Sequence, residues 1–224
     1  MPVYRLLNVF TAEDGLNGNP LGVFLDGAAI PAAERQRVAG DLGYSETVFV
    51  DDVETGALRI FTPATELALA GHPLVGTAWL IAHERGACEM LRPPAGDVAT
   101  WQDGDVRWIR ARPEWAPEME LRQYGTPAEV EALDGAPDDL GFVDCWAWLD
   151  ERAGLLRSRV FAPEAGVAED EATGAAAFRI AALHGRPLEI RQGKGSLLHT
   201  RPGPDGMIDV GGRVRDRGEH SYGD

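Results

Sequence analysis

The sequence predicts an α+β fold of two similar halves, each a curled sheet around a central apolar helix. The main observation is an internal repeat, since Ile60-Phe61-Thr62-Pro63-Ala64 recurs as Val160-Phe161-Ala162-Pro163-Glu164 at a spacing of 100 residues. Each copy is typical of a strand end closed by a proline, and a short acidic connection and an apolar helix follow it. Because a helix that is apolar on all sides must be covered on all sides, each helix should lie within its own sheet.

The first central helix is expected near residues 73–85 and the second near 172–184. Gly86 and Gly185 can end them, because glycine readily adopts the left-handed conformation of a helix C-terminus. Pro73 suits the first helical position, where its missing N–H costs nothing. This placement predicts His72 as the N-cap of the first helix.

Strand-like stretches at residues 46–50, 107–111 and 188–192 are available to cover these helices. The proline-rich stretch 112–117 predicts the boundary between an N-terminal half (1–115) and a C-terminal half (116–224). Residues 127–139 predict a short surface helix without chemistry. The tail 213–224 alternates charge without apolar periodicity, which predicts a solvated or frayed end.

The composition limits the possible partners. The chain has 21 Lys+Arg against 36 Asp+Glu, for a net charge of −15, and no basic cluster that would favour nucleic acid or an anionic membrane surface. No apolar run approaches the roughly 20 residues that cross a bilayer, and the start lacks a signal-peptide pattern, so we expect a cytoplasmic protein. Cys88 and Cys145 stand apart from the five scattered histidines, so no metal site is indicated.

The starts of the two apolar helices are the predicted site, because unpaired N–H groups and the helix dipole can hold a carboxylate without Lys or Arg. Candidate acid–base groups lie there: His72 in the first half, and Asp170 with Glu169 in the second. A third is Glu46 in an apolar strand, where burial would raise its pKa toward the range of a proton shuttle. Plainer interpretations stay open: Glu46 could be a solvated carboxylate at the edge of a strand, and His72 and Asp170 could be helix caps.

Several short motifs follow one another along nearly the whole chain. They are Asn8-Val9-Phe10-Thr11, Gly18-Asn19-Pro20-Leu21-Gly22-Val23, Ser45-Glu46-Thr47-Val48-Phe49-Val50, Phe61-Thr62-Pro63 with Glu66, Ala70-Gly71-His72-Pro73 with Gly76-Thr77-Ala78, and Glu169-Asp170-Glu171-Ala172-Thr173-Gly174. In this order they resemble the PhzF family of phenazine-biosynthesis-like isomerases. The resemblance implies the diaminopimelate-epimerase-like fold, with the active site between two pseudo-symmetric halves.

The resemblance also implies a function. The implied protein is a cofactor-free isomerase that forms a homodimer. In it, a glutamate moves a proton between carbons of a small unsaturated carboxylate such as dihydro-3-hydroxyanthranilate. Natural-product biosynthesis is the implied setting. The family's glutamate, histidine and aspartate fall on Glu46, His72 and Asp170. By the same match, the substrate-binding residues are Ser45, Asn19, Gly71, Gly174 and Ala175.

The chain departs from the family pattern at several points. Ala175 replaces a serine, the Gln-Gly segment survives only in part at residues 192–196, and the second half is short. Ala70 and Thr173 stand where racemases of this fold carry two cysteines, which disfavours two-thiol racemisation. These departures leave open a non-catalytic ligand-binding or assembly protein with the same fold. A hydrolase is less favoured, because no G-x-S-x-G motif is present.

Overall fold

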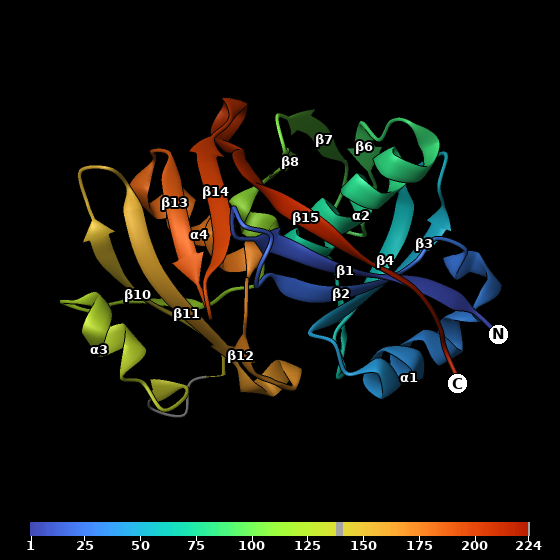
Figure 1. The fold of residues 1–224 in the computed structure, drawn as a ribbon, viewed down its shortest axis with the longest axis horizontal. Helices are drawn as coiled ribbons and strands as arrows, with labels where there is room; N and C mark the ends of the chain where they lie inside the picture. The colour runs from blue at the N-terminus through green and yellow to red at the C-terminus, as the bar shows by residue number, and fades with distance from the viewer. Residues whose placement is uncertain (138–140, 224) are drawn as a thin grey trace.

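The computed structural model describes residues 1–137 and 141–223. In this part of the chain the strands join into one continuous sheet of 15 strands, which curves around two central helices (Figure 1). These helices are α2 (Gly71–Arg85) and α4 (Gly174–His184), and most of their residues are buried. The predicted α+β fold class is confirmed.

The N-terminal part of the sheet, in the order β5-β4-β3-β2-β1, surrounds α2. Strands β2 and β3 pair in parallel through a crossover that contains helix α1 (Ala32–Leu42). Val38 of α1 packs with Phe24 and Phe49 of the sheet in a second apolar cluster. The strands are β1 (Val3–Thr11), β2 (Asn19–Phe24), β3 (Glu46–Asp52), β4 (Ala57–Phe61) and β5 (Glu66–Leu67).

The C-terminal part repeats this arrangement around α4. The sequence β10-β11-β12-α4 mirrors β3-β4-β5-α2, a strand hairpin followed by a short strand and an apolar helix. Strands β9 and β10 pair in parallel, as do β11 and β13. The elements are β9 (Glu120–Gln123), α3 (Pro127–Glu131), β10 (Val143–Asp150), β11 (Leu155–Ala162), β12 (Val167–Asp170), β13 (Leu188–Gln192) and β14 (Ser196–Pro202).

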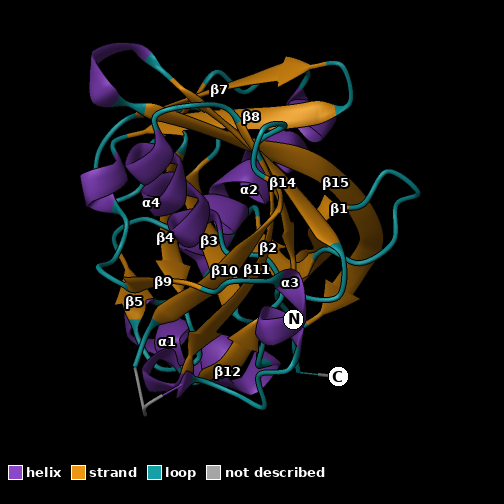
Figure 2. Ribbon diagram, turned by 90° about the vertical axis from the view of Figure 1, so that its left-hand side faces the viewer, coloured by secondary structure: helices purple, strands orange, loops and turns teal. Residues whose placement is uncertain are grey.

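The last strand, β15 (Ile208–Ser221), joins the two parts of the sheet. It pairs with β14 and with β8 (Val106–Ala111) near its beginning and with β1 farther along. Strands β7 (Val98–Asp103) and β6 (Met90–Leu91) continue the sheet from β8, and Figure 2 shows β7 and β8 at one end of the molecule. The expected frayed end is therefore wrong for residues 213–221, because their backbone pairs with β1.

Both helices belong to one hydrophobic core. Leu74 and Val75 of α2 lie in the same cluster of buried apolar side chains as Phe178 and Ile180 of α4. This core and β15 both connect residues on the two sides of the expected boundary between residues 115 and 116. The division into two halves at that point stays a prediction. In the part of the chain that the structure describes, no helix has both the length and the apolar character needed to span a bilayer.

Two helix predictions need correction. Helix α2 begins at Gly71 after the N-cap residue Ala70, with no side-chain cap, so His72 lies in the first turn and is not the N-cap. The physical reason is that proline fits any position of a first helical turn, and Pro73 is the third residue of this helix and not the first. Helix α3 covers only residues 127–131 of the expected 127–139 and is held by a Thr126–Glu129 capping box; residues 138–140 lie outside the described part.

Candidate active site between two helix starts

The starts of α2 and α4 touch each other. A Cβ atom added to Gly71 would lie 2.6 Å from Gly174 Cα, and one added to Gly174 would lie 2.5 Å from Gly71 Cα. Glycine is therefore required at both positions by space, since real Cβ atoms do not approach backbone so closely. The chain thereby brings two helix N-termini, each with the positive end of its dipole, to one point.

The first N–H groups of both helices have no acceptor within their own helix. The first helical hydrogen bond of α2 runs from Leu74 N to Ala70 O, and Ala177 N donates to Thr173 O in α4. The N–H groups of Gly71, His72, Gly174 and Ala175 come before these bonds in the chain, so they have no acceptor within their own helix. Such a pair of helix starts can hold a carboxylate, as the sequence predicts.

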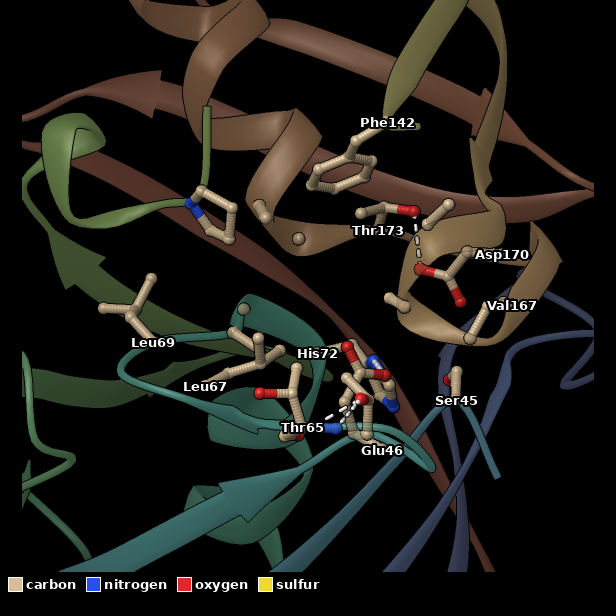
Figure 3. Close-up of a pocket in the computed structure, with 18 of the residues that line it drawn as sticks. Ser45, Glu46, Thr65, Leu67, Leu69, His72, Phe142, Val167, Asp170 and Thr173 are labelled. Atoms are coloured by element: carbon tan, nitrogen blue, oxygen red, sulfur yellow. Dashed lines mark hydrogen bonds and ion pairs between the residues drawn. The ribbon is translucent and has the colours of Figure 1, made fainter. Parts of the chain in front are cut away.

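A cavity of about 310 Å³ opens beside the two helix starts. Figure 3 shows Glu46, His72 and Thr65 on one side of it, and Asp170, Thr173 and Phe142 on the other. The charged side chains among the described lining residues are all acidic: Glu46, Glu118, Glu164 and Asp170. Its apolar lining includes Leu67, Leu69, Ala70, Pro117, Phe142 and Val167.

Glu46 is the first residue of β3 and is 9% exposed, which rules out the alternative of a solvated strand-edge carboxylate. Its Oε2 atom lies 3.2 Å from Nδ1 of His72. Burial, followed by the negative charge of Asp170, raises the pKa of Glu46 to about 8. Its side chain can therefore carry or release a proton near neutral pH.

His72 lies fully inside the protein, with 1% of its surface exposed. Burial lowers the pKa of His72 to about 3, so the imidazole is neutral near pH 7. A neutral ring offers one nitrogen as a donor and the other as an acceptor. His72 is therefore a hydrogen-bonding neighbour of Glu46 and not a cation that neutralises it.

Asp170, at the end of β12, faces Glu46 from the C-terminal part. Asn19 Nδ2 donates to its Oδ1 at 2.6 Å, and the Thr173 hydroxyl donates to its Oδ2 at 2.6 Å. Burial raises the pKa of Asp170 to about 6, and the donors from Thr173 and Asn19 oppose that rise. The N-cap of α4 is Thr173, so Asp170 is not the cap of that helix.

The structure brings most predicted site residues together and excludes one. Ser45, Gly71, Gly174 and Ala175 line the cavity with the three acid–base candidates, and the Ser45 hydroxyl donates to Asn19 Oδ1 at 3.0 Å. Glu169 is exposed and forms an ion pair with Arg159. It is therefore not part of the site, because the side chains of a strand alternate in direction and its neighbour Asp170 faces inward.

Sequence reasoning missed two contributors. Thr173 was considered only as the replacement of a racemase cysteine, yet its hydroxyl contacts Asp170. Gln192, 1% exposed, bonds to both Asp170 and Thr173. Gln192 ends β13 at an inward-facing position, in line with the buried Leu188 and Ile190, and a polar residue at such a position was the available signal, since buried amides need partners.

We expect burial of Glu46 to make the protein less stable as the pH rises. A carboxyl whose pKa is higher in the folded than in the unfolded state binds more protons when folded, so its stabilisation is lost between pH 4.5 and about 8. Glu46→Gln cannot ionise, so its free energy of unfolding should exceed that of the wild type at pH 8 by an amount on the order of a few kcal/mol. Urea unfolding of both proteins at pH 5 and pH 8 measures this; an unchanged difference would show that Glu46 is solvated.

Comparison with known proteins places the whole chain. Residues 7–111 match the PhzC-PhzF family model, described as phenazine biosynthesis-like protein. A trans-2,3-dihydro-3-hydroxyanthranilate isomerase from Pseudomonas fluorescens is 33% identical, over 85% of this chain and 85% of its own. A putative phenazine biosynthesis PhzC/PhzF protein from Clostridium difficile shares the fold with a TM-score of 0.78, at 19% identity and 98% coverage of both chains. A hydroxyproline epimerase from Agrobacterium vitis gives a TM-score of 0.64 at 14% identity, covering 98% of this chain and 92% of its own.

Proposed function

The chain belongs to the PhzC-PhzF family of phenazine biosynthesis-like proteins, and from this premise we propose that it is an isomerase that moves a proton, and with it a double bond, on a small unsaturated carboxylate. The named relative from Pseudomonas fluorescens supports a substrate that resembles trans-2,3-dihydro-3-hydroxyanthranilate. The reaction needs no cofactor in this proposal, because a side-chain acid–base group supplies the proton transfer.

The observation that carries the proposal is the placement of Glu46 at a cavity between two helix starts. Its carboxyl lies beside neutral His72 and faces a second buried carboxyl, that of Asp170. A group poised near neutral pH is suited to both giving and taking a proton within one reaction. The free N–H groups at Gly71 and Gly174 support binding of the substrate carboxylate.

The remaining walls support the same reaction. Leu67, Leu69 and Phe142 offer apolar surface for a hydrocarbon ring or chain. Apolar walls reduce the amount of water beside a bound substrate, which strengthens the hydrogen bonds inside, while the carboxyl still exchanges with water between turnovers. Ala175 in place of the family serine leaves its backbone donor available.

The proposal is tested by isomerisation in deuterium oxide. A carboxyl that exchanges with water between turnovers should place solvent deuterium on the carbon that gains hydrogen, and partial labelling is expected where transfer is faster than exchange. NMR of the product from trans-2,3-dihydro-3-hydroxyanthranilate measures the position of the label. Label at a different carbon, or no turnover of this and related dienoic acids, would contradict the proposed activity.

We also propose a homodimer, as the resemblance to the family implies. Light scattering coupled to size-exclusion chromatography measures it, since the 24.2 kDa chain should then elute at twice its own mass. A mass equal to one chain over the concentrations used for activity would contradict the dimer.

A further inference from the structure

We propose that the resting enzyme holds its catalytic proton on Glu46 and keeps Asp170 ionised, so that catalysis begins with protonation of the substrate, and that Gln192 is the positioning residue behind this arrangement. The inference rests on the proposed function, whose site it describes. Its basis is the direction of a chain of buried hydrogen bonds that leads from Gln192 through Thr173 to Asp170.

The orientation of the Gln192 side-chain amide is fixed by the backbone. Its Oε1 accepts from Thr173 N at 3.0 Å, and a backbone N–H can only donate. Its Nε2 donates to Asp170 O at 2.9 Å, and a backbone carbonyl can only accept. The opposite orientation would break both bonds, so Nε2 must also face the Thr173 hydroxyl.

This orientation sets the direction of the next bond. Gln192 Nε2 donates to Thr173 Oγ1 at 2.8 Å, which occupies a lone pair of the hydroxyl oxygen. The single Thr173 O–H is then free to donate to Asp170 Oδ2, 2.6 Å away. Gln192 therefore acts on the Asp170 carboxylate through Thr173.

The second oxygen of Asp170 is held in the same way. Asn19 Nδ2 donates to the backbone carbonyl of Ala172 at 3.0 Å, which fixes the Asn19 amide, and its other hydrogen reaches Asp170 Oδ1. Both carboxylate oxygens thus accept from donors that cannot turn away. A proton on either oxygen would point at a donor hydrogen, so the network favours the ionised form of Asp170.

Glu46 has weaker support than Asp170, because only hydrogen bonding from Ser45 opposes the rise of its pKa, whereas Thr173, Asn19 and Ser45 all oppose that of Asp170. In the described part of the chain its Oε2 has no hydrogen-bond donor, and Nδ1 of His72 accepts from a Glu46 O–H in the tautomer that carries the ring hydrogen on Nε2. The one hydroxyl hydrogen of Ser45 is used by Asn19 Oδ1, because the fixed Asn19 amide presents an oxygen there. When two close carboxyls share one proton, the proton therefore belongs on Glu46.

The charges around the cavity fit a reaction that starts with protonation. The Glu46 O–H gives its proton to one carbon, the double-bond pair forms the new C–H bond, and the O–H pair stays on the carboxylate. This carboxylate then takes a proton from a second carbon, whose C–H pair forms the shifted double bond. The transient positive charge on the substrate faces Asp170, Glu118 and Glu164, and no Lys or Arg is among the described lining residues.

The position of the proton is tested without turnover by infrared spectroscopy at pH 7. The neutral-acid carbonyl band should decrease in Glu46→Gln and persist in Asp170→Asn. Another buried carboxyl, Asp144 of β10, also has a pKa that burial raises, to about 7. It contributes equally to all three proteins and cancels in the difference. A band lost only in Asp170→Asn would overturn the inference about the proton, but it would not contradict the proposed isomerase function of the wild type.

The role of Gln192 is tested by the pH profile of kcat/KM. The charged and titratable groups that face the pair are His72 of α2, Glu171 beside Asp170, and Glu118 and Glu164 at the cavity. The value of kcat/KM should decrease when the pH falls below the pKa of Asp170, and again when the pH rises above the pKa of Glu46. A bell shape alone does not tell which carboxyl holds the proton, and the infrared measurement does.

Thr173→Val and Gln192→Glu both remove the hydroxyl donor from Asp170, so each should move the acid limb to higher pH by about one unit or more. Thr173→Ser keeps the hydroxyl and should leave that limb in place. Lower activity in Thr173→Val and Gln192→Glu with an unmoved acid limb would mean a merely structural role and would overturn the assignment. Absence of isomerisation in the wild type, in contrast, would count against the proposed function and not against the infrared result.

Discussion

Glu46→Gln should lower kcat/KM at least about 10²–10⁴-fold, the range that general acid–base groups contribute. The substitution keeps the size of the side chain and its ability to hydrogen-bond His72, but the amide cannot exchange a proton at neutral pH. Glu46 is the carboxyl beside His72 at the cavity, and the other buried carboxyl of the lining, Asp170, is held by Asn19 and Thr173, so it does not take over the role of Glu46. Steady-state kinetics with trans-2,3-dihydro-3-hydroxyanthranilate measures the loss.

Glu169→Gln is the matched control, because it makes the same chemical change one residue from Asp170. The Glu169 side chain is exposed and paired with Arg159, so the rate should stay near that of the wild type. Binding of substrate to Glu46→Gln, measured by calorimetry, separates lost chemistry from lost affinity. Near wild-type turnover by Glu46→Gln would end the proposed mechanism and favour a different proton carrier.

The repeat in the sequence predicted more of the fold than local propensity alone would allow. Two apolar helices after two strand ends predict a separate sheet around each helix; α2 and α4 are each surrounded by strands, but these belong to one continuous sheet because β15 pairs with both parts. The sequence does not predict the strand at residues 213–221, because its side chains are mostly charged and do not indicate that its backbone pairs with β1. A strand segment with polar side chains on both faces gives no period-two apolar pattern, even where its backbone pairs with a distant segment.

The sequence predicts which candidate residues share one place, but not their contacts. Glu46 and Asp170 are its acid–base candidates, and both line the cavity, while their roles stay a prediction. The direction of the bonds from Gln192 through Thr173 was not predictable, because it depends on which backbone groups of β12 and α4 lie within reach. The start of α2 was misplaced by two residues, since Pro73 is compatible with any position in a first helical turn.

Gly174→Ala should disrupt the site and destabilise the fold together. The added Cβ would lie 2.5 Å from Gly71 Cα and 2.8 Å from His72 N, both of them backbone atoms that cannot rotate away. The two helix starts must then separate, at a cost of about 1–3 kcal/mol or more for an overpacked core. Because that movement shifts the N–H groups of both helices, affinity for a substrate carboxylate should fall along with stability.

Gly40→Ala in α1 is the matched control for this substitution. Its Cβ would meet only the Pro63 carbonyl oxygen at 3.4 Å, and alanine in a helix interior is favoured over glycine by roughly 0.5–1 kcal/mol. Gly40→Ala should therefore match or exceed the wild type in thermal stability and retain its activity. If Gly174→Ala instead bound and turned over substrate like the wild type, the contact between the two helix starts would not be what positions the anion site, because the backbone would have moved without consequence.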